Sequence, residues 1–429
     1  MIRRLLRAPV LLALPLALVA SACAEKLETS AACPLLCPGQ ELNIRDTIID
    51  PAIAFDTTLA GFPLLGAEPN LLFASRGDTL DVRPVIRFDT LVRSFAPGVD
   101  TSRAVTFVDS ATLSVRLRKT GLKVPQSFFI DAYDVGDTTL VDSLPLTLLP
   151  LFTAPRLIGS VQVDSATFVD SVAVRIPLDT AKLLAIITTP GAVLRIGLRL
   201  RSTESGAFWV ASSDDPATGP RLRYRVSADT TVGAIELLPF SQTPRRPLAV
   251  SGDFNDYVIV ADAPVIGAPS RFVVGGLPGV RTYLRFDLPR WLTDSAAVLR
   301  ARLEFVQDPV RGLDVAVPFT IRAQLVIAGN ATTDLNRAAR LLAPPGFFIT
   351  DSLRVSPADT GAVQIEINGL VRQFRTVGGV RPIPTAIVLR ADLEGTSALG
   401  ARFFGLGAAP ALRPRLRVSY VPSIRFGQP

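Results

Sequence analysis

The chain has 429 residues, of which 48% are hydrophobic and 7% aromatic, with 35 prolines, 30 glycines and a formal net charge of +7. This length is too great for one ordinary domain, and the frequent turn residues favour short β-strands joined by loops. The sequence contains no histidine, which excludes Ser-His-Asp and Cys-His catalysis, most zinc sites and c-type haem ligation.

Residues 1–22 predict a secretory signal peptide, because a basic start precedes an apolar stretch over 8–20 that is too short to span a bilayer. The tetrapeptide ASAC that ends at Cys23 is similar to a bacterial lipobox. We therefore expect acylation of Cys23, which would hold the protein on a membrane without a transmembrane helix. Ala24 after this cysteine favours the outer membrane or cell surface. The alternative is an ordinary signal peptide followed by a chance cysteine.

Residues 23–40 are poor in strand pattern and predict a lipidated tether. Cys33 and Cys37 lie within it. In an oxidising compartment we expect a local disulfide between them, and free or intermolecular thiols are the alternative. Two thiolates without a histidine do not complete a structural zinc site.

The chain then repeats itself, which predicts two similar domains. Three blocks recur in the same order in the two halves: 85–91 and 283–289, 107–118 and 292–303, and 197–226 and 387–421. We place the first domain at 41–228 and the second at 251–424, with the Pro-rich stretch 229–250 as the linker.

Strict alternation of apolar and polar residues predicts half-buried antiparallel strands. It places Leu113, Val115 and Leu117 on one face of the first repeat, with Ser and Arg residues opposite. It likewise places Leu416 and Val418 inward in the second repeat. Segment 296–305 is also expected to be a strand, and four of its side chains are expected to point inward: Leu299, Ala301, Leu303 and Phe305. Short helices are expected at 179–187, 334–342 and 368–375. The sequence therefore predicts an all-β fold of two tandem antiparallel β-sandwiches, for which a jelly roll is one topology.

Segments 279–305, 368–374 and 401–421 together resemble the DNRLRE-type domain family. The resemblance covers most of the second domain and is weaker in the first, where an extra stretch intervenes around 140–160. It implies jelly-roll sandwiches of the kind found on secreted and cell-surface bacterial proteins. Such domains are similar to carbohydrate-binding modules, and some bind polysaccharides, so the resemblance supports the fold more than any ligand.

Candidate binding residues are few. Trp209, Trp291 and Phe404 are the aromatics that could stack on a sugar ring, and core packing is the alternative for each. The triplet Arg-Phe-Asp occurs at 87–89 and at 285–287, where we expect an ion pair on one sheet face rather than a ligand site. Acidic residues in turn-like sequence would suit calcium or would simply be solvated: Asp46, Asp50, Asp214, Asp215, Asp253 and Asp256.

From these features we expect a non-catalytic, lipid-anchored envelope or cell-surface protein whose sandwiches are structural or interaction modules. Its partners would be the membrane and a polysaccharide or envelope protein. The arginines are spread along strands and mixed with Asp, so we expect no nucleic-acid partner. The alternative is a polysaccharide-binding lipoprotein that captures glycan for a partner enzyme. A glycan hydrolase that uses two carboxylates is the weakest hypothesis.

Overall fold

The structure is a computed structural model that describes residues 44–422 apart from internal gaps. The gaps fall at 64, 67, 97–101, 137–144, 169, 230, 243–253, 264, 311–316, 328–351 and 376–384. Several predictions lie outside the described residues: the signal peptide, the lipidation site at Cys23, the tether with Cys33 and Cys37, the helix at 334–342, and Asp253.

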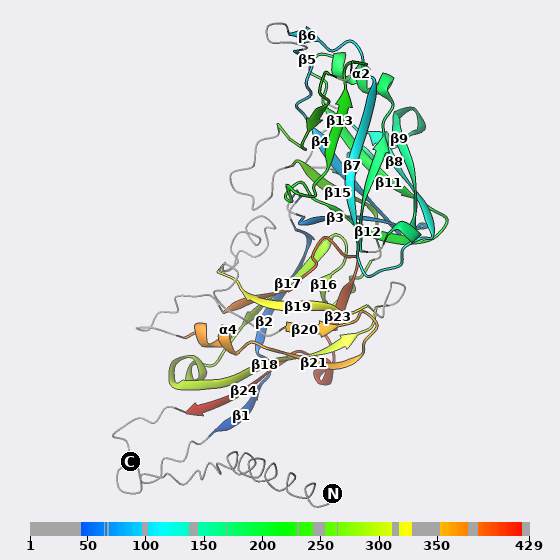
Figure 1. Ribbon diagram of the computed structural model, residues 1–429. Helices are drawn as coiled ribbons and strands as arrows, with labels where there is room; N and C mark the ends of the chain where they lie inside the picture. The colour runs from blue at the N-terminus through cyan, green and yellow to red at the C-terminus, as the bar shows by residue number, and fades with distance from the viewer. Residues whose placement is uncertain are drawn as a thin grey trace, which may run out of the picture. The chain divides into compact units, whose positions relative to one another are not determined.

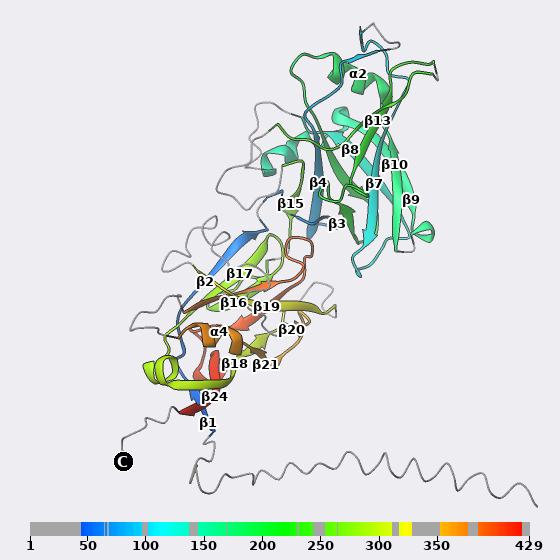
Figure 2. The same cartoon turned by 60° about the vertical axis from the view of Figure 1, so that its left-hand side comes forward.

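The first of two large antiparallel sheets has the strand order β14-β13-β7-β12-β3-β4-β11-β8-β9 (Figure 1). In addition, β10 pairs with β7, as Figure 2 shows, and β15 pairs with β4. Its strands are β3 (Asn70–Arg76), β4 (Leu80–Phe88), β7 (Ser110–Lys119), β8 (Ser127–Asp134), β9 (Leu157–Asp164), β10 (Ser171–Pro177), β11 (Leu194–Arg201), β12 (Gly206–Ala211), β13 (Arg221–Arg225), β14 (Ile235–Leu237) and β15 (Asp256–Asp262).

The second sheet has the strand order β1-β24-β18-β23-β16-β17-β22-β19-β20, with β21 paired to β18 and β2 paired to β17. Its strands are β1 (Arg45–Ile49), β2 (Ile53–Phe62), β16 (Arg271–Gly275), β17 (Gly279–Phe286), β18 (Ala296–Asp308), β19 (Phe319–Leu325), β20 (Ser352–Val355), β21 (Gly361–Glu366), β22 (Ala386–Ala391), β23 (Gly400–Phe404) and β24 (Arg415–Pro422). Strand for strand, this order matches that of the first sheet, as the internal repeat predicts.

The remaining elements are short. β5 (Ser94–Phe95) and β6 (Arg103–Ala104) pair with each other. Helices α2 (Thr180–Thr188) and α4 (Asn368–Gln373) confirm two of the expected helices. Short 3-10 turns occupy Pro145–Leu151, Ala154–Arg156, Ser165–Thr167 and Pro410–Leu412, and a π-helical turn occupies Trp291–Ser295. No helix among the described residues is long and apolar enough to cross a membrane.

Each sheet encloses its own hydrophobic core, which makes it a sandwich. In the first, Leu222 of β13 and Ile130 of β8 come from opposite parts of the strand order yet belong to one buried cluster. In the second, Leu416 of β24 and Ile321 of β19 do the same. The alternation in β7 buries Leu113, Val115 and Leu117, as predicted. The structure therefore confirms an all-β fold of antiparallel sandwiches.

One inward assignment is wrong. Leu299 is 42% exposed, whereas Ala301, Leu303 and Phe305 are buried as expected. A β-bulge lies between Val298 and Arg300 where β18 pairs with β24. The extra residue shifts the alternation by one position, so Val298 points inward in place of Leu299.

Two pairs of strands, here called the arms, complete a sheet made mostly by the other half of the chain. The N-terminal arm, β1 and β2, pairs with β24 and β17 of the second sheet. The arm formed by β14 and β15 pairs with β13 and β4 of the first sheet, at the equivalent positions. Strand pairing therefore crosses the boundaries expected at 41–228 and 251–424, and β14 lies within the stretch 229–250.

Candidate functional site

Trp209 is only partly exposed and is held by the fold. It alternates with the fully buried Phe208 on β12, so its ring points to the other face. Its indole Nε1 donates to the carbonyl oxygen of Thr396 at 2.6 Å, and its ring packs against the first core. The single polar group of the ring is thus bonded within the protein.

Phe404 and Trp291 lie on different elements from Trp209. The guanidinium of Arg271 covers the Phe404 ring at 4.1 Å from its centroid. Trp291 is 41% exposed and contacts Tyr420 with a ring-centroid separation of 4.6 Å. Within the part of the chain that the structure describes, no ring contact joins the three predicted aromatics. Each of the three side chains lies in its own local environment.

The acidic residues expected in turns fall into two neighbourhoods. Asp256 accepts from the Ser213 amide at 2.5 Å and from Ser212 Oγ at 3.3 Å. Burial raises its pKa, and the charge of nearby Asp214 adds to the rise. Asp215 binds Thr218 Oγ1 at 2.5 Å and Arg118 at 2.9 Å, bonds that lower its pKa to about 2.

Asp46 and Asp50 lie instead on β1 and beside it, where they contact β24. Among the described residues, no group of three or more His, Cys, Asp or Glu side chains could hold a metal ion. The acidic residues brought together by the structure therefore bond to serines, threonines and arginines.

The first Arg-Phe-Asp triplet forms the ion pair that its spacing predicts. Arg87 and Asp89 are bonded to each other with side chains only 1% and 2% exposed, and Phe88 lies in the core. Asp89 also accepts from the backbone amide of Gln242 at 2.9 Å. In the second triplet Phe286 is likewise buried in its core. The first triplet is therefore a buried ion pair beside a core phenylalanine, whereas Asp287 of the second triplet is exposed.

A buried acid that the sequence analysis did not single out is Glu68, which is 4% exposed. Burial raises its pKa to about 8, against hydrogen bonds from the backbone amides of Glu68, Gly66 and Val258, and the charge of Asp256 raises it further. Its Oε2 has no hydrogen-bond partner among the described residues. Burial also raises the pKa of Asp256 to about 6. The sequence feature that could have identified Glu68 is an isolated acidic residue next to an apolar run.

Glu68 lines a cavity of 320 Å³ whose wall is mostly apolar and includes Phe62, Leu65, Val258 and Leu277. At neutral pH its carboxyl group is protonated, since its pKa lies above 7. A neutral carboxyl group in an apolar wall carries no charge to attract a substrate. The neighbouring carboxylate, Asp256, is bonded to Ser212 and Ser213.

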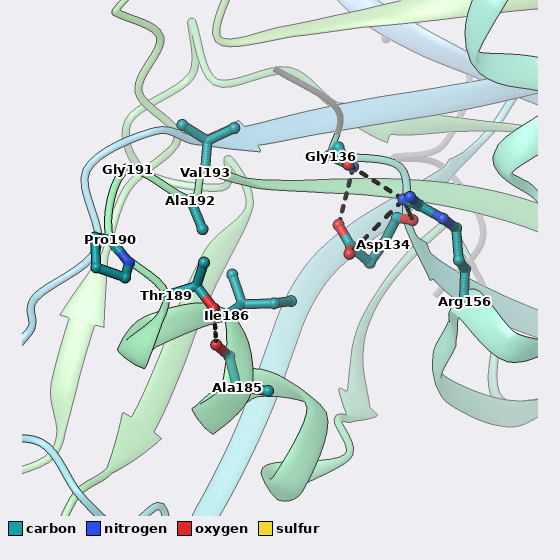
Figure 3. Close-up of a pocket in the computed structure, with 10 residues that line it drawn as sticks. All are labelled: Asp134, Gly136, Arg156, Ala185, Ile186, Thr189, Pro190, Gly191, Ala192 and Val193. Atoms are coloured by element: carbon teal, nitrogen blue, oxygen red, sulfur yellow. Dashed lines mark hydrogen bonds and ion pairs between the residues drawn. The ribbon is translucent and has the colours of Figure 1, made fainter. Parts of the chain in front are cut away.

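A larger depression has a volume of 720 Å³. Figure 3 shows its lining, which comprises residues 185, 186 and 189–193 around the end of α2, together with Asp134, Gly136 and Arg156. Arg156 Nη1 donates to the carbonyl oxygens of Asp134 and Gly136 at 3.0 and 3.1 Å. Burial raises the pKa of Asp134, although the Gly136 amide and the Arg156 charge oppose the rise. Arg156 also pairs with the Asp134 carboxylate at 3.9 Å. The one other polar side chain of the lining, Thr189, donates its hydroxyl to the Ala185 carbonyl oxygen at 2.7 Å.

The outward face of the first sandwich carries a row of arginines across β10, β7 and β13. Because the alternate residues of these strands fill the core, the outward positions lie side by side on one surface. We call this surface the arginine face: Arg116, Arg118, Arg175, Arg221, Arg223 and Arg225. Ser110, Thr112 and Ser114 of β7 lie between the arginines in the register.

Only two members of the arginine face form an ion pair in the described part of the chain. Arg118 pairs with Asp215 at 2.9 Å and Arg221 with Glu236 at 2.6 Å. Arg175 and Arg223 are exposed, and Arg116 contacts only the hydroxyl of Ser171, at 3.3 Å. The face therefore carries a surplus of positive charge.

The equivalent face of the second sandwich is balanced. We call it the paired face: Asp46, Asp50, Arg300, Arg302, Glu304, Glu366, Arg415 and Arg417 on or beside β1, β24, β18 and β21. Arg300 and Arg302 both bind Glu366, at 2.5 and 2.8 Å, and Arg417 binds Glu304 at 2.7 Å. A polar hollow of 490 Å³ lies over it. With four arginines and four acids, this face has no net charge.

The fold and these surfaces define an all-β protein of two antiparallel sandwiches with polar outward faces. No family model matches the chain, and no curated protein matches it. Among solved structures, the capsid structure of infectious bursal disease virus strain Gx is 12% identical and aligns over 88% of this chain and 80% of its own, with a TM-score of 0.14. The VP2 subviral particle of the same virus is 12% identical over 85% and 79%, also with a TM-score of 0.14. Similarity at this level carries no conclusion about fold or function.

Proposed function

We propose that this protein is a non-catalytic, lipid-anchored envelope or cell-surface protein of the outer membrane whose two sandwiches serve as structural or interaction modules. The lipobox-like sequence before Cys23 supports the anchor. The resemblance to DNRLRE-type domains supports display on the bacterial surface. Two cored sandwiches with polar outward faces suit a protein that works through its surface.

The observation that supports the non-catalytic part is that Asp215 and Asp256, two of the acidic residues singled out from the sequence, bond to their neighbours within the fold. Asp215 is bonded to Arg118 and Thr218, and Asp256 to Ser212 and Ser213. A general acid or base must be within hydrogen-bond reach of a substrate proton. Carboxylates that bond to neighbouring side chains and amides support a structural role for these residues.

Membrane fractionation tests the anchor. Wild-type protein should partition with detergent, and Cys23→Ser should appear in the aqueous phase or remain unprocessed. Cys37→Ser is the matched control, since it removes a cysteine from the same tether but leaves the lipobox-like sequence intact. If Cys23→Ser partitioned like the wild type, the proposed acylation would be refuted.

Incubation with a panel of polysaccharides tests the absence of catalysis. We expect no new reducing ends and no unsaturated products. Product release that disappears in Asp256→Asn or Asp214→Asn, but persists in the exposed control Asp229→Asn, would instead establish a carboxylate-based glycan hydrolase.

A second candidate function is capture of polysaccharide for a partner enzyme. One observation favours it: the arginine face has a surplus of charge, whereas the equivalent paired face is neutral. Two related sandwiches with the same strand order thus differ in the property that attracts a charged ligand.

A further inference from the structure

We propose that the arginine face binds an acidic polysaccharide, with its guanidinium groups pairing the carboxylates of uronic acid residues. This inference rests on the proposed role of the sandwiches as interaction modules and names the ligand class of one of them. It concerns the outward surface of β10, β7 and β13.

The charge of the face selects an anion. Arg175 and Arg223 are exposed and form no ion pair among the described residues, and Arg116 contacts one serine hydroxyl. A guanidinium is always charged and presents planar donors that match a carboxylate in a bidentate arrangement. These three groups have no acidic partner among the described residues, so an external anion can pair with them without displacing an internal ion pair.

The register arranges the charges as repeating rows. Arg175 and Arg221 lie on either side of Ser114, because both are its partners in the neighbouring strands. Arg223 lies two residues from Arg221 on β13, a spacing of about 7 Å along a strand, while neighbouring strands are about 4.8 Å apart. A polymer with regularly spaced carboxylates can therefore meet several arginines at once.

The hydroxyl groups between the arginines suit a sugar. Ser110, Thr112 and Ser114 are outward on β7, and a hydroxyl both donates and accepts hydrogen bonds. The outward positions of β10 that pair with this strand are Ser171, Ala173, Arg175 and Pro177. Nucleic-acid surfaces combine positive charge with aromatic rings on which bases stack. The described outward positions of these strands hold no aromatic residue on which bases or sugar rings could stack, so an acidic polysaccharide would bind here through its carboxylates and hydroxyl groups.

Each contact of this kind is weak because exposed ion pairs are screened by water and salt. Binding must therefore come from many contacts along one chain, through the high effective concentration of neighbouring carboxylates. This requirement excludes a single acidic monosaccharide as the physiological ligand. It also predicts that affinity falls as ionic strength increases.

The test uses the full-length, detergent-solubilised protein and two probes, polygalacturonate and neutral dextran. Binding is measured by titration calorimetry at about 0.01 M and about 0.15 M salt, where the Debye length is about 30 Å and about 8 Å. We expect binding of polygalacturonate that weakens with salt, and no binding of dextran. Absence of polygalacturonate binding at low salt, or equal binding of dextran, would overturn the inference.

Matched variants locate the site. The triple variant Arg116→Gln, Arg175→Gln and Arg223→Gln should weaken binding by about tenfold or more, because three charges are lost from one face. The control triple variant Arg300→Gln, Arg302→Gln and Arg417→Gln removes the same charge from the paired face. The control should stay within about twofold of the wild type, and equal losses in the two variants would refute the assignment to the arginine face.

Two further measurements separate the outcomes. Single-stranded DNA as a competitor should displace polygalacturonate poorly, and efficient displacement would overturn the choice of polysaccharide. Thermal melts of both triple variants report whether a loss of binding reflects a loss of folding, and single substitutions at Arg175 and Arg223 then replace the triple variant. Loss of membrane anchoring in Cys23→Ser together with absence of glycan binding in the wild type would refute only this inference and leave the anchored module in place.

Discussion

The buried acid Glu68 should make the stability of this protein depend on pH. Its pKa is raised from 4.5 to about 8, mainly by burial. Each pKa unit corresponds to about 1.4 kcal/mol, so ionising Glu68 in the folded protein costs on the order of 5 kcal/mol. The free energy of unfolding of a single domain is about 5–15 kcal/mol. This one group can therefore remove a large part of it.

The direction of the effect follows from where the proton is held. The folded protein retains the proton that the unfolded chain releases above its own pKa of about 4.5. The contribution of Glu68 to stability is therefore greatest below that pH, falls as the pH rises through the interval, and is flat above about 8. Asp256, with its pKa raised from 3.8 to about 6, contributes in the same direction at the acidic end of the interval.

The change Glu68→Gln keeps the shape of the side chain and removes its ionisation. At pH 8.5 the variant should be more stable than the wild type by several kcal/mol, on the order of 3–5 kcal/mol. At pH 4.5 the two should differ by only about 0.4 kcal/mol, since Glu68 is then protonated in the folded protein and half protonated in the unfolded chain. Urea unfolding at pH 4.5, 7 and 8.5 measures this, with fluorescence from the two tryptophans as the signal.

The control is Glu236→Gln, which changes a half-exposed glutamate on β14 that pairs with Arg221. It should alter the free energy of unfolding by about 1 kcal/mol or less. Equal wild-type stability at pH 4.5 and 8.5 would contradict the raised pKa of Glu68. Parallel dependences of the wild type and Glu68→Gln on pH would contradict it as well.

Three further predictions concern the framework, and urea unfolding checks each of them. Leu416→Ala should cost about 2–5 kcal/mol because Leu416 is fully buried in the second core, whereas its neighbour Arg417→Ala should cost about 1 kcal/mol or less; equal costs would mean that the register of β24 is wrong. In Gly279→Ala the new Cβ would lie 2.1 Å from the Phe62 carbonyl oxygen, so we expect a loss of about 2 kcal/mol or more where β2 meets β17, while Gly233→Ala, with nothing within 4 Å, should change stability by about 0.5 kcal/mol or less. Asp179→Ala removes the side chain that caps α2 through the Ala181 and Lys182 amides and should cost about 1 kcal/mol; an unchanged stability would show that the cap contributes nothing.

The strands were predictable because their pattern is local. Leu113, Val115 and Leu117 alternate with polar residues, and this alternation alone places them in the core. The bulge at Val298 was not predictable, since it depends on how β18 pairs with β24 rather than on the residues of β18. Leu299 was assigned to the wrong face for that reason.

The binding surfaces were less predictable than the fold. Both outward faces are rich in arginine, and only the register shows that Arg302 meets Glu366 while Arg175 meets Ser114. Burial of Glu68 is equally a tertiary property, because its neighbour Val258 is far away in the sequence. The pairing of the arms was not predictable either, because alternation identifies a strand but does not indicate which strand it pairs with.

The N-terminal arm also determines how a pulling force would pass through the protein. In a chain held at Cys23, a force on a ligand of the first sandwich is transmitted to the anchor through β2 and β1. These strands lie between Cys23 and the first sandwich in the sequence. These strands are hydrogen-bonded to β17 and β24 over Ile53–Phe62 and Arg45–Ile49. The second sandwich is thus hydrogen-bonded to the segment that bears the force. Its own strands from β16 to β24 do not lie between the anchor and the first sandwich along the chain. Under tension, the hydrogen bonds of β1 with β24 and of β2 with β17 would have to break before the N-terminal arm could extend.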